Sequence, residues 1–337
     1  MKFLTASNTH GLLPLHHRLR REGHDCEALV WRSKYDKAWD GSVAKLLRQR
    51  DGSLNASNLK DAVSEAQKGG LGVLTDVHRV AELFHTAPLL HRTYKTPTTP
   101  VDAVRVGGWF TGEEVRAPHL LVADVGAWTG GLGPAVLGGL TLIRTSLSPE
   151  LLKEATQAAT TQMKQQGFKG LFHFDILEVP ETGELKLNGM EVGWPWLHTQ
   201  AFVAELASLG TVLQGEEPTL QCRYVTAMPV SIPPWPSERQ GPGEEVPIEG
   251  LTPTQQGRMM WHDIKVRPSE RKLTTAGLDG LVGVALGASN STPALARARA
   301  LELCQRLQVP ELQYRQDAGA RVDQALATLE DRWGFSV

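Results

Sequence analysis

The chain opens with short apolar runs that flank one amphipathic segment. Residues 3–6 and 26–31 are predicted strands, because short apolar runs bounded by turn residues are typical of buried strands. Residues 12–22 form the helix expected between them, and Gly23 is its expected C-terminal stop. A third strand is expected at 71–76. This strand–helix–strand order predicts a small open α/β layer with parallel strands.

The middle of the chain changes to a pattern of paired strands. Residues 101–106 and 115–122 form one expected pair. Residues 171–179 and 184–192 form a hairpin around a Pro-Glu-Thr-Gly turn. Before this hairpin, residues 148–167 carry apolar positions at helical spacing, with a Ser-Pro-Glu start and a glycine stop.

The last third is read as loop and then as alternating elements. Residues 228–256 are rich in proline and glycine, which favours irregular structure. A strand at 281–285 and two helices, at 292–308 and 323–332, are expected after it. The region therefore predicts a strand covered by helices.

Composition and charge narrow the class of protein. At 337 residues the chain is long enough for two or three domains. Its net charge of −2 gives no global field for nucleic acid or anionic membrane. The three cysteines are far apart, and the start lacks the long apolar core of a signal peptide. A cytoplasmic protein with neither nucleic acid nor membrane as partner is expected.

A glycine-dense loop follows the first strand pair, at residues 124–134. Such a loop offers backbone N–H groups at close range, which suits a bound phosphate or carboxylate. Because glycines also punctuate ordinary turns, a tight structural turn is the alternative.

Five short motifs, in the same order along the chain, resemble one known family. They are residues 111–115 (TGEEV), 129–133 (TGGLG), 199–200 (TQ), 281–284 (LVGV) before an alanine-rich helix, and 314–319 (YRQDAG). These are similar to the motifs of phosphoribosylamine–glycine ligase, also called glycinamide ribonucleotide synthetase, an ATP-grasp enzyme of purine biosynthesis. Their shared order covers roughly residues 105–325.

The resemblance implies a fold of the α/β and α+β class. A small open α/β domain is expected at residues 1–86, and 87–104 form a connector. A truncated ATP-grasp-like mixed sheet is expected at 105–220, and a C-terminal α+β lobe at 221–337.

The resemblance also implies ATP-dependent joining of a carboxylate to an amine, with magnesium to neutralise phosphate charge. Glu113 and Glu114 fall at the positions expected near the ATP cofactor. The residues expected to bind a small-molecule substrate are Asp124, Gly126, Thr129, Gly130, Gly131, Arg315 and Asp317.

The metal site is expected on the hairpin, since magnesium prefers carboxylate oxygens. If Asp175 lies across from Gly189, then Asp175 and Glu191 share one face with His173. The opposite face would then bury Phe172, Phe174 and Ile176. The alternative is that both carboxylates are ordinary polar residues facing solvent.

The chain departs from the family at the groups that carry its chemistry. Without a gap, the family's Glu-x-Asn-x-Arg becomes Gly189, Glu191 and Gly193. A shift of two residues puts Glu191 at the Glu position, with Gly193 and Pro195 in place of the Asn and the Arg. The segment at 87–105 is too short for the lysine-bearing subdomain, and Lys95 is its only lysine. Two hypotheses follow. One is an active ligase whose lid comes from a partner or a second protomer in a homo-oligomer. The other is an inactive descendant that binds a ligand or assists assembly.

Overall fold

The computed structural model describes most of the chain outside two long stretches. The described residues are 2–7, 12–30, 72–75, 103–134, 136–144, 160–178, 185–193, 196–236 and 243–333, with short gaps at 162, 166, 244, 268–271 and 278. Lys95, most of the expected connector and the expected helix start at 148 lie outside them.

The first elements form a small parallel sheet, as expected. They are β1 (Lys2–Ser7), α1 (Leu13–Arg21), β2 (Asp25–Val30) and β3 (Gly72–Thr75). The strand order is β2-β1-β3, with both pairings parallel. Gly23 has a φ of +84°, which explains why α1 ends there: only glycine adopts this conformation at low cost.

A nine-stranded sheet forms the body of the molecule. Its strands are β4 (Ala103–Phe110), β5 (Val115–Val125), β6 (Leu137–Arg144), β7 (Gly170–Glu178), β8 (Leu185–Gly193), β9 (Tyr224–Ser231), β11 (Met259–Trp261), β14 (Leu281–Ser289) and β15 (Gln313–Tyr314). The order is β11-β14-β9-β6-β5-β4-β7-β8, with β15 beside β9, and every pairing described for it is antiparallel. One sheet thus crosses the expected domain boundary at residue 220, and that boundary stays a prediction.

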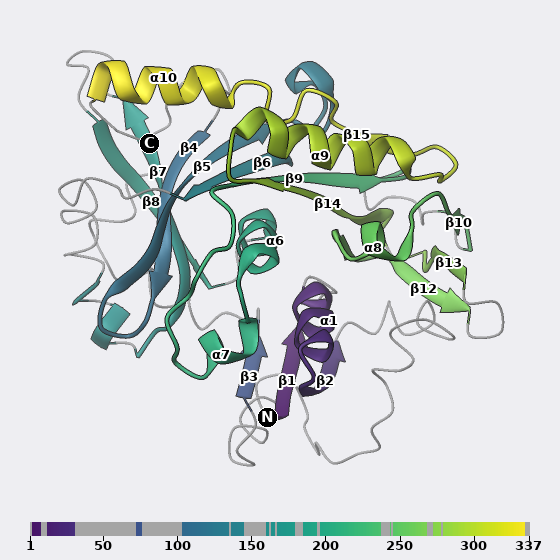
Figure 1. Cartoon of the computed structure of the whole chain (residues 1–337), viewed down its shortest axis with the longest axis horizontal. Helices are drawn as coiled ribbons and strands as arrows, with labels where there is room; N and C mark the ends of the chain where they lie inside the picture. The colour runs from purple at the N-terminus through teal and green to yellow at the C-terminus, as the bar shows by residue number, and fades with distance from the viewer. Residues whose placement is uncertain are drawn as a thin grey trace.

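Helices cover both faces of this sheet (Figure 1). One face carries α9 (Pro293–Arg306) and α10 (Val322–Trp333). The other carries α6 (Trp196–Glu205) and α7 (Leu209–Leu213), with α1 and the small sheet beyond them. A short 3-10 helix, η2 (Thr129–Gly131), lies in the glycine-rich loop, and a third sheet has the order β10-β13-β12. The remaining elements are β10 (Pro247–Ile248), α8 (Pro253–Gln256), β12 (Ile264–Arg267) and β13 (Lys272–Thr275).

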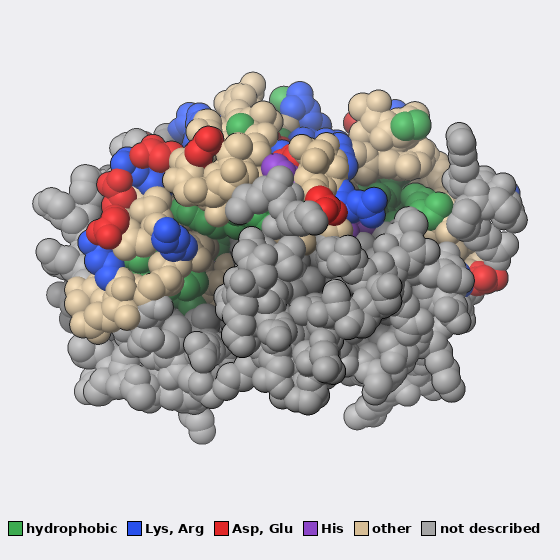
Figure 2. All heavy atoms as spheres, turned by 90° about the horizontal axis from the view of Figure 1, so that it is seen from below, with side chains coloured by type: hydrophobic (Ala, Val, Ile, Leu, Met, Phe, Trp, Pro, Cys, Tyr) green, Lys and Arg blue, Asp and Glu red, His purple; other side chains and the backbone are tan. Residues whose placement is uncertain are grey.

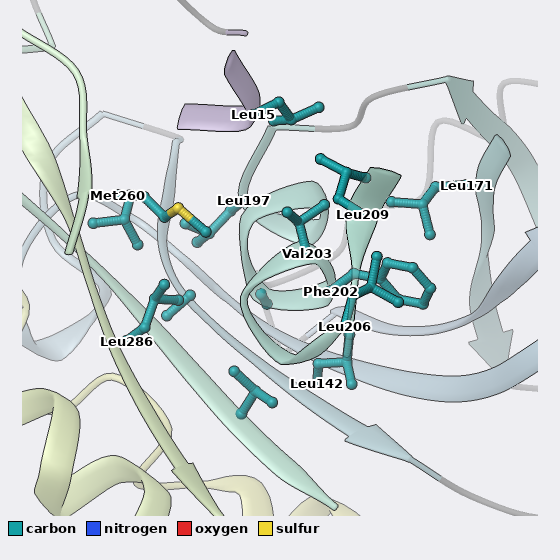
Figure 3. Packing of buried hydrophobic residues seen from close by; sticks show 14 of the residues in the cluster. Leu15, Leu142, Leu171, Leu197, Phe202, Val203, Leu206, Leu209, Met260 and Leu286 are labelled. Atoms are coloured by element: carbon teal, nitrogen blue, oxygen red, sulfur yellow. The ribbon is translucent and has the colours of Figure 1, made fainter. Parts of the chain in front are cut away.

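Alternation along the strands explains the two cores. On β5, Leu121 and Ala123 belong to the cluster around α6, whereas Leu120 and Val122 belong to the cluster with α10. Figure 3 shows the first cluster, in which Phe202 and its helical neighbours point at the sheet and at α1. A third cluster joins α9 to the far end of the sheet.

The expected loop at 228–256 was partly wrong. Strand β9 extends to Ser231 in the interior of the sheet, and all its residues are buried. Pro229 sits within it, opposite Val284 of β14. Burial of both faces between two helical layers therefore outweighs the loop preference of the prolines.

The described part of the surface has no single-sign field on the face drawn in Figure 2. Acidic and basic side chains are interspersed there. No helix in the described ranges is both long and apolar enough to cross a membrane.

Candidate functional site: the β7–β8 hairpin and the glycine-rich loop

The β7–β8 hairpin places Glu191 directly across from His173. The Glu191 carboxylate lies 3.1 Å from His173 Nε2. The register shifts after Phe174, so Asp175 faces Asn188 and not the expected Gly189. An extra residue in β8 accounts for this difference, because a bulge sets two residues against one. The shared face of His173 and Glu191 survives the shift.

The other face of β7 is buried as expected. Phe172, Phe174 and Ile176 pack in the cluster that contains Met163 and residues of α10. Strand alternation therefore leaves His173 and Asp175 together on the opposite face.

Asp175 is held by a cation that the sequence analysis did not anticipate. Arg105 of β4 pairs with Asp175 across the strands, and its Nε donates to Asp175 Oδ1 at 2.7 Å. The Asp175 side chain is 40% exposed. The hairpin thus carries two solvent-accessible carboxylates, Asp175 beside Arg105 and Glu191 beside His173.

Behind His173 lies a line of buried histidines, which with Glu191 we call the histidine row. His173 Nδ1 lies 3.2 Å from His198 Nδ1. His198 Nε2 lies 2.6 Å from His119 Nε2, and His119 Nδ1 lies 2.7 Å from the Ala117 carbonyl oxygen. The row therefore runs through β8, β7, α6 and β5.

Burial lowers the pKa of both inner histidines, His119 and His198. It lowers the pKa of His119 to about 4, with the nearby His173 adding to the fall and the hydrogen bond to Ala117 opposing it. Burial also holds the pKa of His198 well below its ordinary value, and His119, His173 and Arg105 add to this effect.

Gly107 makes room for the row. A Cβ at this position would lie 2.6 Å from the Phe172 carbonyl oxygen, 3.1 Å from His173 Cβ and 3.2 Å from His119 Nε2. A glycine is needed here for packing, because the histidines of the neighbouring strands occupy the space that a side chain would fill.

The hairpin fits the chemistry of a magnesium site with few protein ligands. Asp175 and Glu191 supply hard oxygen donors, and magnesium commonly takes one or two carboxylates with phosphate and water. No group of three or more His, Cys, Asp or Glu side chains that could hold a metal occurs in the described ranges. These two residues would hold the metal, whose chemistry is to neutralise phosphate charge.

The expected substrate residues also come together, at the other end of β5. Buried Arg315 donates from Nη1 to the Val125 carbonyl at 2.7 Å and from Nε to Asp317 at 2.9 Å. The Gly130 N–H donates to Asp317 at 3.0 Å, and the Gly319 N–H donates to Asp124 at 2.7 Å.

Within this cluster the polar groups bind one another. Thr129 accepts from the Gln316 N–H at 3.2 Å, and the Gly131 N–H donates to the Trp128 carbonyl. Gly126 has a φ of +100°, and a Cβ there would lie 2.6 Å from the Gly131 oxygen. The roles of these residues as substrate ligands remain predictions.

The acidic pair of the TGEEV motif lies in an exposed turn. Glu113 pairs with Lys164 at 2.8 Å, and this hydrogen bond lowers the pKa of Glu113. Glu114 pairs with Arg116, which also contacts Glu217 at 2.9 Å. Their role near a nucleotide stays a prediction.

His119, His198 and Arg105 were not predicted to belong to a site. His119 and Arg105 lie in expected strands, where a titratable residue inside an apolar run was the available signal. His198 lies in α6, which was not anticipated. Which residues meet depends on the strand pairing, and a single strand's pattern does not contain it.

The comparisons with known proteins place the fold. The sequence matches no protein-family model and no curated protein. Among solved structures, Rhizobium etli pyruvate carboxylase matches with a TM-score of 0.57 and 11% identity, over 98% of this chain and 38% of that chain. The biotin carboxylase domain of a single-chain bacterial carboxylase matches with a TM-score of 0.52 and 10% identity, over 98% of this chain and 100% of that one.

A Thermotoga maritima phosphoribosylamine–glycine ligase also matches, with a TM-score of 0.48, 16% identity, and 65% of this chain on 55% of that chain. This chain therefore spans about half of that ligase and less of the pyruvate carboxylase. At such identities the likeness shows the fold alone. That fold is ATP-grasp-like, as in the two carboxylases.

Proposed function

We propose that the chain is a diverged relative of phosphoribosylamine–glycine ligase that joins a carboxylate to an amine with ATP and Mg²⁺. The observation that carries this proposal is the hairpin, where Asp175 and Glu191 stand on one face of an ATP-grasp-like sheet. Their basic neighbours, Arg105 and His173, suit a site where phosphate oxygens and metal meet.

The reaction divides into two balanced steps. The substrate carboxylate attacks the γ-phosphorus of ATP, which gives an acyl phosphate and ADP. The amine then attacks the acyl carbon, and inorganic phosphate leaves as the C–N bond forms and the amine loses a proton. Glu113 and Glu114 are assigned to the nucleotide side.

The substrate side of the proposal is the glycine-rich loop. Thr129 and Gly130 are exposed and reach a small-molecule substrate, while Arg315, Asp317 and Asp124 hold the loop in shape. A partner chain or a second protomer supplies the lysine-bearing lid.

The test is a calorimetric titration of ATP with Mg²⁺, followed by assays of ADP and phosphate release with glycine and other acid–amine pairs. We expect Glu191→Ala and Asp175→Ala to weaken nucleotide binding at least about tenfold. Glu302→Ala, which alters only an exposed pair with Arg306, is the matched control. Absence of heat and of thermal shift with every nucleotide would sink the proposal.

A catalytically inactive ligand-binding or assembly protein is the second candidate. It is favoured by the Arg105–Asp175 ion pair and by the hydrogen bonds that the loop makes to Asp317. Nucleotide binding without ADP formation, across the acid–amine pairs, would select this candidate.

A further inference from the structure

The glycine-rich loop folds back on itself as a small hairpin. Trp128 and Leu132 form an antiparallel bridge, and the Trp128 N–H donates to the Leu132 carbonyl oxygen at 3.1 Å. The Gly131 N–H donates to the Trp128 carbonyl oxygen at 3.1 Å and closes the turn. Residues directly opposite each other in an antiparallel pair place their side chains on the same face. The indole of Trp128 and the isobutyl group of Leu132 therefore lie together.

The Trp128 ring lies on the backbone of Gly133. A Cβ atom at Gly133 would lie 2.4 Å from Cε3, 2.7 Å from Cζ3 and 2.9 Å from Cδ2 of the ring. A point beyond the ring edge would be much nearer to Cε3 than to its two bonded neighbours, so these similar distances put the glycine under the face of the ring. Gly133 has a φ of +84°, which glycine adopts at low cost. One face of the indole is therefore held by the loop, while Trp128 remains 40% exposed.

The loop turns apolar side chains to solvent and uses its polar groups internally. The Gly130 N–H donates to Asp317, and the Gly131 N–H donates to Trp128. Three large hydrophobic side chains are exposed in the part of the chain that the structure describes, and two of them are Trp128 at 40% and Leu132 at 67%. A ligand of this loop therefore meets an aromatic face and an aliphatic group.

The charge beside this surface favours a cation. The Asp317 side chain is 29% exposed, whereas that of its partner Arg315 is 2% exposed. The carboxylate therefore reaches solvent, and the guanidinium does not. The face of an indole ring also carries negative potential, so it attracts cations. An ammonium group fits this surface better than a phosphate or a carboxylate.

We propose that the loop binds the amine substrate and that this amine carries a planar ring, as in the arylalkylamines. The ring stacks on the exposed face of Trp128, Leu132 contacts the ring, and the ammonium group lies toward Asp317. This inference rests on the proposed function, since it names the class of amine that the ligation consumes. Trp128 determines specificity, because an aliphatic amine has no ring face to stack on the indole.

The experiment titrates the full chain, labelled with ¹⁵N at its tryptophan indoles, with phenethylamine in the absence of ATP. The Trp128 indole signal, assigned by its loss in Trp128→Phe, should shift more than that of any other tryptophan. We expect phenethylamine to bind at least about tenfold more tightly than ethylamine, which lacks the ring, and than phenylacetate and inorganic phosphate, which are anions. Phenethyl alcohol, which keeps the ring and lacks the charge, should bind less tightly than the amine.

Variants of the loop test the role of the indole. Trp128→Ala should weaken phenethylamine binding at least about fivefold, and Trp128→Phe should retain most of it because a ring remains. Leu295→Ala is the matched control, since Leu295 is a 39% exposed leucine of α9, outside the loop. It should bind phenethylamine as the unaltered chain does.

The ligand series on the unaltered chain covers the case in which Trp128→Ala fails to fold. Equal binding of phenethylamine and ethylamine, or tighter binding of phenylacetate or phosphate, would overturn the inference. Phenethylamine binding at Trp128 without any ATP binding would retain this site and defeat the proposed function. ATP-dependent turnover with amines that lack a ring, while no amine shifts the Trp128 signal, would do the reverse.

Discussion

The glycine-rich loop and the histidine row differ in how their polar groups are bound. In the loop, Arg315 and the Gly130 N–H are donors that meet acceptors of the same cluster. In the row, ring nitrogens of His119, His198 and His173 contact one another in turn, and His173 Nε2 lies 3.1 Å from the Glu191 carboxylate. The polar groups of the loop cluster bind one another, whereas the row leads from buried rings to the Glu191 side chain, which is 57% exposed.

The loop cluster therefore has a structural role, whereas the histidine row remains a candidate functional site. Arg315 ties β5 to the segment after β15, and its partner Asp124 is equally buried. A buried ion pair of this kind is costly to break, because removal of one partner leaves the other charge uncompensated.

The largest expected effect comes from removing the Arg315 guanidinium from the loop cluster. Arg315→Met should lower the free energy of unfolding by about 3–5 kcal/mol, because it removes the cation that faces the carboxylates of Asp124 and Asp317. Urea denaturation measures it. Arg306→Met removes an exposed pair with Glu302 and should cost about 0–1 kcal/mol. Equal losses in the two variants would contradict the distinction.

A smaller effect is expected from crowding the histidine row. Gly107→Ala places a methyl group 2.6 Å from the Phe172 oxygen and 3.2 Å from His119 Nε2. The strands must shift, at a cost of about 1–3 kcal/mol. Thermal unfolding gives the loss, and ¹⁵N signals of His119 should move with it. An unchanged unfolding temperature together with unchanged ¹⁵N signals would contradict the tight packing of Gly107 against the histidine row.

The smallest effect concerns the acid dependence of the loop cluster. Burial raises the pKa of Asp317, but hydrogen bonds from Arg315 and the Gly130 N–H outweigh it and hold the pKa below its ordinary value. The stabilisation is therefore present above the ordinary pKa and is lost as pH falls through the lowered one. Asp317→Asn should cost about 1–2 kcal/mol at pH 7.

The difference between the variant and the unaltered chain should shrink as pH falls from about 5 toward 3. Urea denaturation at a series of pH values measures it. A difference that stays constant with pH would show that Asp317 acts through shape and not through charge.

Much of the fold was readable from local pattern. The opening parallel layer, the hairpin and the C-terminal helices were predicted within a few residues, because each carries its own periodicity and stop signals. Strands β6 and β9 were not predicted, because the glycines of β6 and the proline of β9 are residue types that favour loops. Their burial between helical layers is a tertiary property.

The sequence by itself determined which faces are buried and where the chain turns, because side-chain alternation and glycine conformations are local. It also determined that Asp175, His173 and Glu191 share a face. The tertiary structure alone decided that His198 meets His173 and His119, which lie 25 and 79 positions before it in the chain. The reason is physical: contacts between strands and a helix depend on register, on the bulge after Phe174 and on the space that Gly107 leaves.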